Sequence, residues 1–319
     1  MQYENVAFDQ LHIDIARNST DDFNPFHDPR RWSAICGNPF AGPIALGFQL
    51  EFFCSDRIQR ARVAQKLDLA LPYRNFEFNF AGALPAGEPG QLDVRKTVDK
   101  RASGGGLSNR VLLRKADGAP VLLGSQSDTV KPRFWNGIDI TGLAGLSHLA
   151  DRSMIPGRDL FLKRKFLTTS NAKNFAIAAL CDQQDYIDEL DESVAFPPLF
   201  TAAMSSCALL ERATASGHDF TTEPLVYTSH QISVDMRLQS QLRSNDLIHF
   251  LVSAPETRAT GKGLGKACVE QSSLFCMAIL EDGQTLFHAK LQLASLAAVS
   301  AVSNSNVSSA TSKAVASPR

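Results

Sequence analysis

The segment Ile44-Ala45-Leu46-Gly47-Phe48-Gln49-Leu50-Glu51-Phe52-Phe53-Cys54-Ser55-Asp56-Arg57-Ile58 decides the fold, together with the shorter segment Phe76-Glu77-Phe78-Asn79-Phe80 that follows it. In the first segment, apolar residues recur at three- and four-residue spacing, which predicts a helix with a buried face. In the second segment, apolar and polar residues alternate, which predicts a strand with one buried face. Together they predict a sheet that packs against one apolar helix.

Three further strands are predicted in this part of the chain, at Gln91–Val98, Leu107–Lys115 and Val121–Val130. Asp117-Gly118 separates the last two strands and is typical of a hairpin turn, because glycine accepts a positive φ. The first half of the chain therefore predicts a helix followed by an antiparallel meander.

The same order of elements occurs again in the second half of the chain. A helix is predicted at Leu199–Ala213 and an alternating strand at Ile232–Met236. Later strands are predicted at Leu247–Val252, Cys268–Leu280 and Thr285–Ala294. Glu281-Asp282-Gly283 is the predicted turn between the last two. Such self-similarity indicates an internal duplication. The predicted fold class is therefore α+β, with one helix and one antiparallel sheet in each half.

The duplication sets the domain boundaries. Residues 1–135 form the first unit and residues 157–296 the second, with the glycine-rich residues 136–156 as a linker. Residues 297–319 are rich in Ala, Ser, Val and Asn without apolar periodicity, which predicts a disordered tail. The length of 319 residues fits two such units, since a domain takes about 150 residues.

The composition argues against several classes of protein. Lys and Arg (32) nearly balance Asp and Glu (33), whereas a nucleic-acid binder carries a basic excess. No apolar run reaches the roughly 18 residues of a membrane-spanning helix, and the N-terminal residues 1–5 lack the features of a secretory signal. The six cysteines include no CxxC pair, which argues against disulfides and a zinc site. We therefore expect a cytoplasmic protein without a metal, a nucleic-acid partner or a membrane partner.

The segment Asp22-Phe23-Asn24-Pro25-Phe26-His27 precedes the first apolar helix and carries most of the chemical information. A turn fixed by Pro25 can bring the Asp22 carboxylate and the His27 imidazole into one small volume, where they can hold and deprotonate a water molecule. Asn24 would keep this turn in place. The alternative is local, because Asp and Asn before a proline are common turn formers, and Asp22 would then only cap a turn.

The segment Phe40-Ala41-Gly42-Pro43-Ile44-Ala45-Leu46-Gly47 leads into the same helix. The first amides of a helix lack intrahelical partners and carry partial positive charge, so they suit a developing oxyanion. Gly47 would let a ligand approach the backbone closely. Alternatively, the glycines of this segment only allow the helix to pack tightly against the sheet.

These two motifs, Asp22-x-Asn24-Pro25-x-His27 and Phe40–Gly47, resemble the signature of the MaoC-like (R)-specific enoyl-CoA hydratases. The resemblance implies a double hot-dog fold, in which two tandem curved antiparallel sheets each wrap a central helix. It extends over roughly residues 6–294 through the order of the predicted elements, and only the first half carries the sharp motif.

The resemblance also implies roles for single residues. Asp22 and His27 would be the catalytic pair that activates water, with Asn24 orienting it. The amide of Gly47 would polarise the thioester carbonyl. The substrate-binding residues would be those just before this glycine: Pro43, Ile44, Ala45 and Leu46. The family usually has a glycine where this chain has Asp21, and often a histidine where it has Leu46.

The implied reaction is the reversible hydration of a trans-2-enoyl thioester to an (R)-3-hydroxyacyl thioester. No separate cofactor is implied, because coenzyme A or the pantetheine of an acyl-carrier protein is part of the substrate. The chain would be a monomer with its two sheets paired, or a homodimer. Two alternatives stay open: a hot-dog acyl-CoA thioesterase with the same oxyanion amide, and a non-catalytic subunit that binds acyl thioesters.

The second half lacks the motif. Ile187 takes the place of the histidine, Ala202 that of the glycine at the helix start, and Asp182 that of the first aspartate. Ile232 takes the place of Phe76 in the first alternating strand. An aspartate without an imidazole partner is a poor activator of water, so we expect a single active site in the first half.

Overall fold

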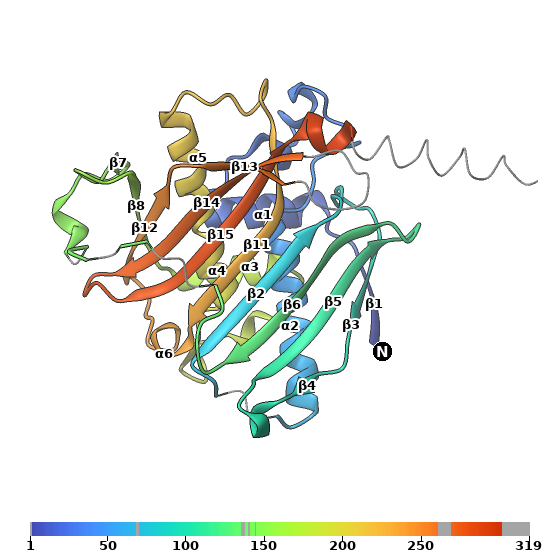
Figure 1. Ribbon diagram of the computed structural model, residues 1–319. Coiled ribbons are helices and arrows are strands. Elements are labelled where there is room, and N and C mark those ends of the chain that lie inside the picture. The colour runs from blue at the N-terminus through green and yellow to red at the C-terminus, as the bar shows by residue number, and fades with distance from the viewer. Residues whose placement is uncertain are drawn as a thin grey trace, which may run out of the picture.

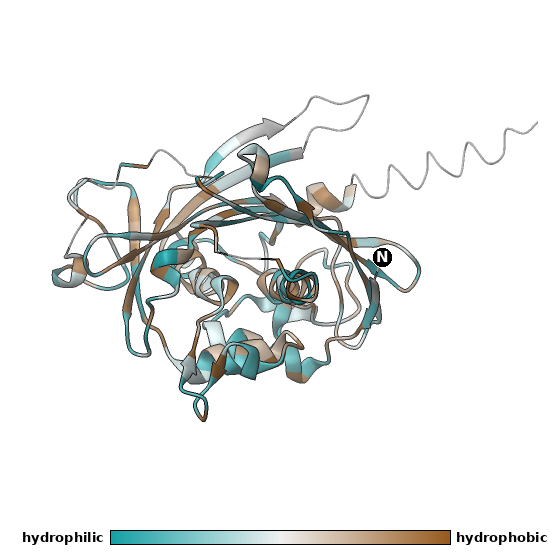
Figure 2. Ribbon diagram, turned by 90° about the horizontal axis from the view of Figure 1, so that it is seen from below, coloured by the Kyte–Doolittle hydropathy of each residue, from teal (hydrophilic) through white to brown (hydrophobic). Residues whose placement is uncertain are grey.

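The computed structural model describes residues 2–67, 70–134, 138–139, 141–143, 145–260 and 269–301. It confirms the α+β double hot-dog fold: within these residues, strands of both halves join in one 13-stranded antiparallel sheet (Figure 1). Figure 2 shows this sheet arching over helices that are seen nearly end-on beneath it.

The strands of the two halves are arranged side by side. Those of the first half are β1 (Gln2–Val6), β2 (Tyr73–Phe80), β3 (Gly90–Val94), β4 (Val98–Asp99), β5 (Leu107–Lys115) and β6 (Pro120–Thr129). Those of the second half are β7 (Ser153–Met154), β8 (Leu160–Phe166), β11 (Leu225–Asp235), β12 (Leu247–Ser253), β13 (Glu256–Thr260), β14 (Val269–Leu280) and β15 (Thr285–Ser295). Their order is β1-β3-β5-β6-β2-β11-β15-β14-β12-β8-β7, with β4 beside β5 and β13 beside β14. A separate pair consists of β9 (Ile187–Asp188) and β10 (Ser193–Val194).

The halves meet at strands β2 and β11, in the middle of the sheet (Figure 1). Phe76 lies directly opposite Ile232 in this antiparallel pair, and both side chains are fully buried. These are the two positions that the duplication makes equivalent, so the seam has the self-complementary geometry of a two-fold interface. The two halves consequently share one hydrophobic core.

The helices lie on the side of the sheet that it curves around (Figure 2). The α-helices are α1 (Gln10–Thr20), α2 (Gly47–Ala64), α3 (Thr169–Ala178), α4 (Pro198–Ala203), α5 (Ser205–Ala215) and α6 (Met236–Gln239). The 3₁₀ helices are η1 (Pro25–His27), η2 (Trp32–Ala34), η3 (Arg101–Ser103), η4 (Leu146–His148) and η5 (Gln183–Asp185). Helix α2 packs against strands of the first half and α5 against strands of the second, while α1 and α3 contact each other.

Helix α2 is buried on almost every side. Its buried residues are both apolar and polar: Phe48, Gln49, Leu50, Glu51, Phe52, Phe53, Cys54, Ser55, Asp56, Ile58 and Arg62. A helix enclosed in this way belongs to the core, and its polar groups need partners there. Gln49 has them, because its side chain accepts the N–H of Leu46 and donates to the carbonyl of Ala178 in the second half.

Helix α2 begins at Gly47 and not at Ile44, where the sequence pattern placed its start. Ile44 forms an isolated β-bridge with Pro85, and Leu46 is still in an extended conformation. The residues before Gly47 therefore approach the helix as an extended segment whose amides are outside it.

The helix predicted at Leu199–Ala213 is divided into α4 and α5 at Met204. At this point the hydroxyl of Ser205 donates a hydrogen bond to the carbonyl of Ala202 at 2.6 Å. Such bonds from serine to the preceding turn compete with the helical pattern and bend helices.

Most predicted strands are present with shifted ends. The strand predicted at Gln91–Val98 is interrupted between β3 and β4, and Met236 begins α6 instead of ending a strand. Both hairpin turns are present, with Gly118 and Gly283 at φ 85° and 86°. Cys268, predicted as the start of a strand, lies outside the described residues.

The predicted linker and tail both contain regular structure. Within residues 136–156, η4 forms and β7 pairs with β8. Residues 296–301 are helical, so the disorder expected from residue 297 is corrected for the first residues of the tail. Leu296 anchors this turn, because its side chain is buried. Residues 135–137, 140, 144 and 302–319 lie outside the described part of the chain.

Candidate active site

The loop that carries Asp22, Asn24 and His27 follows directly from the end of α1. The chain turns there into η1, which consists of Pro25–His27. The Asp22 carboxylate accepts the N–H of Asn24 at 3.0 Å, and the side-chain oxygen of Asn24 accepts the N–H of Phe26 at 3.1 Å. Both side chains therefore stabilise the turn, as the local alternative expected, and this turn fixes the position of His27 at its end.

Asp21 ends helix α1 in the left-handed conformation, with φ 55°. Glycine adopts this conformation without strain, and Asp is among the few other residues that tolerate it. The side chain of Asp21 forms an ion pair with Lys165 of β8. The aspartate in place of the family's glycine thus links the loop to the second half of the chain.

His27 is held by the segment that leads into helix α2. Its Nδ1 lies 2.8 Å from the carbonyl oxygen of Ile44. A carbonyl can only accept, so Nδ1–H is the donor and the neutral ring carries its lone pair on Nε2. Burial lowers the pKa of His27, although the charge of Asp22 and the bond to Ile44 both act to raise it. The imidazole is therefore neutral near pH 7 and can accept a proton at Nε2.

Asp22 acts on His27 through its charge. Both side chains are only 7% exposed, and a carboxylate in such surroundings has a stronger effect than one in water. The described residues contain no direct hydrogen bond between the two side chains. The carboxylate favours the protonated imidazole over the neutral one, so it stabilises the imidazolium that forms when His27 takes up a proton.

Gly47 is the first residue of α2, so its amide is among those with no intrahelical partner. The ring of Phe80 packs directly on this glycine: a Cβ at position 47 would lie 2.9 Å from Cζ of Phe80 and 3.7 Å from Cε1 of His230. The helix start is therefore pressed against the strands β2 and β11, which supports the packing alternative for Gly47.

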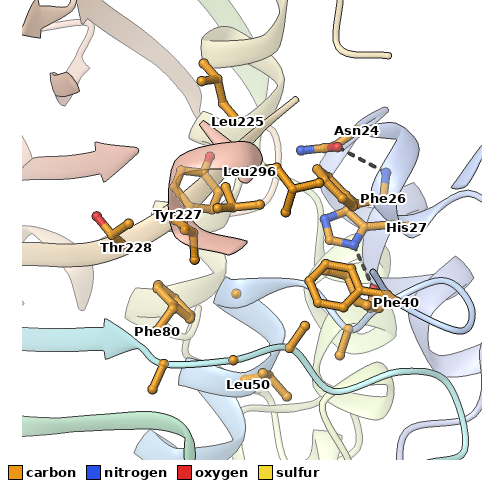
Figure 3. A pocket seen from close by; sticks show the side chains of 18 residues that line it. Asn24, Phe26, His27, Phe40, Leu50, Phe80, Leu225, Tyr227, Thr228 and Leu296 are labelled. Atoms are coloured by element: carbon orange, nitrogen blue, oxygen red, sulfur yellow. Dashed lines mark hydrogen bonds between the residues drawn. The ribbon is translucent and has the colours of Figure 1, made fainter. Parts of the chain in front are cut away.

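A cavity of about 130 Å³ connects His27 with the start of α2 (Figure 3). In Figure 3, His27 and Phe40 lie on one side of it and Phe80 and Tyr227 on the other. Its wall is mostly apolar and includes Phe26, Phe40, Ile44, Leu50, Phe80, Leu225, Val226, Leu296 and Val299. The cavity thus combines one imidazole and one helix end with surroundings that suit an apolar chain.

The structure brings together most of the residues singled out in the sequence. Those that line the cavity are Asn24, His27, Ile44, Ala45 and Gly47. Asp22, Pro43 and Leu46 do not line it: Asp22 lies behind the turn, the Pro43 carbonyl accepts the N–H of Ala86, and Leu46 is buried in the core. Of the four residues from Pro43 to Leu46, Ile44 and Ala45 therefore face the cavity.

The second half contributes residues to this cavity that sequence reasoning missed. Leu225, Val226, Tyr227 and Thr228 of β11 all line it. Burial raises the pKa of Tyr227, and so does the negative charge of Asp22, so the phenol stays protonated and can donate a hydrogen bond. No local motif marks these residues; only the pairing of β2 with β11 brings them to the loop of the first half.

The corresponding loop of the second half has a different chemistry. Asp182 caps η5 by accepting the N–H of Gln184 at 3.0 Å, which is the structural role of Asn24 in the first half. The sequence alignment that paired Asp182 with Asp22 is corrected accordingly. Ile187 is buried at the start of β9 and supplies no imidazole.

The central helix of the second half also starts differently. Helix α4 begins at Pro198, as α2 begins at Gly47, while Ala202 lies inside α4. The predicted match of Ala202 with Gly47 is therefore wrong. Proline has no N–H, so the start of α4 lacks the amide that Gly47 provides. The second half thus has neither the imidazole nor the amide at the positions where the first half has them.

The described residues include no group of three or more His, Cys, Asp and Glu side chains placed to hold a metal ion. They also include no helix with the length and apolar character needed to cross a membrane.

The fold has clear relatives among solved structures. A MaoC domain protein dehydratase from Chloroflexus aurantiacus J-10-fl superposes with a TM-score of 0.60 at 6% identity, covering 92% of this chain and 95% of that one. A Mycobacterium tuberculosis protein described as having a double hotdog fold gives 0.56 at 11% identity, covering 92% and 96%. A MaoC-like dehydratase gives 0.53 at 12% identity, covering 92% and 97%. No family model and no curated protein matches the sequence. At these identities the comparisons establish the double hot-dog fold.

Proposed function

We propose that this chain is a hydratase or dehydratase that interconverts a trans-2-enoyl thioester and an (R)-3-hydroxyacyl thioester. The observation that carries the proposal is the hydrogen bond from His27 Nδ1 to the carbonyl of Ile44. This bond leaves the basic Nε2 to the same cavity that the start of α2 reaches at Gly47. A base and an oxyanion site on one apolar cavity are the two groups that addition of water to an enoyl thioester requires.

In the hydration direction, His27 Nε2 takes a proton from a water molecule, and the water oxygen forms a bond to C3. The electrons of the double bond move to the thioester oxygen, where the Gly47 amide and the positive end of α2 stabilise the charge. The imidazolium then gives its proton to C2. One water molecule is thereby added across the double bond, and the base returns to its neutral form.

The remaining polar groups support this cycle. The charge of Asp22 stabilises the imidazolium between the two proton transfers. Asn24 holds the turn through its bond to the Phe26 N–H and also lines the cavity. Coenzyme A or an acyl-carrier protein presents the thioester, and the apolar wall receives the acyl chain.

The direct test is an ultraviolet assay with crotonyl-CoA and with longer and branched enoyl-CoAs. Hydration removes the absorbance of the conjugated enoyl thioester without releasing thiol. A thiol-trapping reagent in parallel samples detects a thioesterase, which would release free coenzyme A from the same substrates. Binding of acyl-CoA without either signal would instead indicate a non-catalytic subunit, and would overturn the proposal.

A further inference from the structure

A second carboxylate–imidazole pair lies just behind the cavity wall. Glu51 of helix α2 and His230 of strand β11 are both completely buried, and Glu51 Oε1 is 2.8 Å from His230 Nδ1. Burial raises the pKa of Glu51, while His230 acts to lower it. Nothing in the reaction proposed above uses this pair, although burying two such groups carries a desolvation cost that their mutual attraction must offset.

The backbone of β11 is distorted so that His230 points toward the cavity wall. The pairing register of β11 with β15 shifts between Tyr227 and Ser229, which makes Thr228 an extra residue in the strand. In a regular strand, residues three apart point to opposite faces. The bulge brings the rings of Tyr227 and His230 to a centroid distance of 4.4 Å on the same side. Bulges of this kind are frequent next to active sites, where they re-aim a side chain.

Several polar atoms in this region lack a hydrogen-bond partner among the described residues. They are Glu51 Oε2, His230 Nε2 and the hydroxyl oxygen of Thr228, all of them buried. Leaving such atoms without a partner is unfavourable, so they are rare in folded proteins and call for an explanation. Thr228 itself lines the cavity, and His230 lies two residues further along the same strand.

Two rings that line the cavity, those of Phe80 and Tyr227, pack against the His230 ring. His230 Cε1, the carbon between the two ring nitrogens, faces Gly47, and the ring of Phe80 lies 4.9 Å from the His230 ring. Phe80 also lines the cavity and is only partly buried. A rotation of Phe80 about its side-chain bonds would open a path from the start of α2 to Glu51, about 6 Å further along the helix.

We propose that Glu51 and His230 bind a hydroxyl group on the acyl chain of the substrate, with Phe80 turning aside to admit it. A hydroxyl fits this pair because its single O–H donates to the carboxylate while its oxygen accepts an N–H of the imidazole. The enzyme then prefers hydroxylated acyl thioesters over plain ones of the same length. This substrate class rests on the hydratase function proposed above.

The test uses the full chain and matched pairs of ligands. Saturated ω-hydroxyacyl-CoAs of increasing chain length are compared with their plain counterparts by calorimetry, and the corresponding 2-enoyl-CoAs are compared in the hydration assay. At one chain length we expect the hydroxylated ligand to bind about tenfold more tightly and to react with a correspondingly higher kcat/KM. Glu51→Gln and His230→Phe remove this preference, while Phe80→Ala extends it to neighbouring chain lengths.

His249→Phe is the matched control, because His249 is a buried histidine of the same half on β12, away from the cavity. It leaves the preference intact. If the wild type binds the hydroxylated and the plain ligand equally well at every chain length, the inference is overturned. This holds even if plain enoyl-CoAs are hydrated. Preferential binding of hydroxylated ligands without any hydration upholds the pair as a hydroxyl site and overturns only the hydratase function.

Discussion

The two halves share one fold, but they differ at the start of the central helix, which is α2 in the first half and α4 in the second. In the first half, His27 and Gly47 border a cavity. In the second half, aromatic rings fill the corresponding region: Phe175 stacks on Phe52 at 5.7 Å and also contacts Phe200 at 5.7 Å. The double hot-dog fold therefore does not need a cavity at the helix start. It tolerates one in the first half, while residues of both halves build the shared core.

The two central helices also end differently. Arg62 of α2 is completely buried against Asp128, with N–O distance 3.0 Å, whereas Arg212 of α5 pairs with Asp159, whose carboxylate is 68% exposed. Both arginines are buried, but the first half also buries the carboxylate partner, whereas in the second half the carboxylate lies at the surface. The half that carries the cavity at one end of its helix is anchored by buried charges at the other.

The sharpest test of this comparison is His27→Ala. Because the general base is lost, kcat/KM for enoyl-CoA hydration falls by about 10²–10⁴-fold. Gln184→Ala changes an exposed residue of η5, the equivalent turn of the second half, and leaves kcat/KM unchanged. Full activity of a folded His27→Ala protein, checked by circular dichroism, would show that the first half does not carry the reaction.

Asp128→Asn tests the anchoring of α2. The substitution leaves Arg62 and Arg74 without their carboxylate partner, so the free energy of unfolding falls by about 3–5 kcal/mol. Asp159→Asn changes it by about 0–1 kcal/mol, because the Asp159 carboxylate is 68% exposed and solvated by water. Urea denaturation of both variants measures the difference, and equal losses would refute the contrast between the two helix ends.

The pH dependence of stability follows from the same carboxylate. Burial alone would raise the pKa of Asp128, but Arg74 and Arg62 hold it below its ordinary value of 3.8. A depressed folded-state pKa gives stability that is present above the unfolded pKa and is lost as pH falls through the folded one. We therefore expect the wild type, and not Asp128→Asn, to lose this contribution on acidification below about pH 4.

The sequence predicts the fold of both halves because the information is local. Helix α2 and strand β2 have clear apolar patterns, and the loop of Asn24 and His27 is fixed by bonds within a few residues. Helices α1 and α3 escape prediction because small or polar residues make up much of their buried faces, such as Ser19 and Thr20 in α1.

The wall of the cavity could not be predicted because it depends on contacts across the seam. Phe80 and Tyr227 are almost 150 residues apart and meet only because β2 pairs with β11. The bulge at Thr228 then changes which face His230 occupies. A period-two pattern cannot show such a change, since it assumes a regular strand.

Gly47→Ala tests whether the helix start must stay open. The added Cβ would lie 2.9 Å from the Phe80 ring, so the ring moves into the cavity and kcat/KM falls by about tenfold. Phe80→Ala in the same chain restores much of the loss, because the ring that the methyl group displaces is gone. Pro198→Ala at the start of α4 has no effect on turnover. A Gly47→Ala enzyme with unaltered kinetics would mean that the substrate does not approach this helix end.

The smallest expected difference is that between the variants Asp22→Asn and Asp182→Asn. Both aspartates accept a backbone N–H in a turn, but only Asp22 acts on a histidine. Asparagine can keep the bond while it removes the charge that raises the pKa of His27. The pKa of His27 in Asp22→Asn is therefore lower than in the wild type, and the acidic limb of the kcat/KM profile moves to lower pH by about one unit. Asp182→Asn leaves the profile in place. A shift to higher pH, or none, would show that Asp22 only caps the turn, and the first half would then differ from the second by its imidazole and its helix start alone.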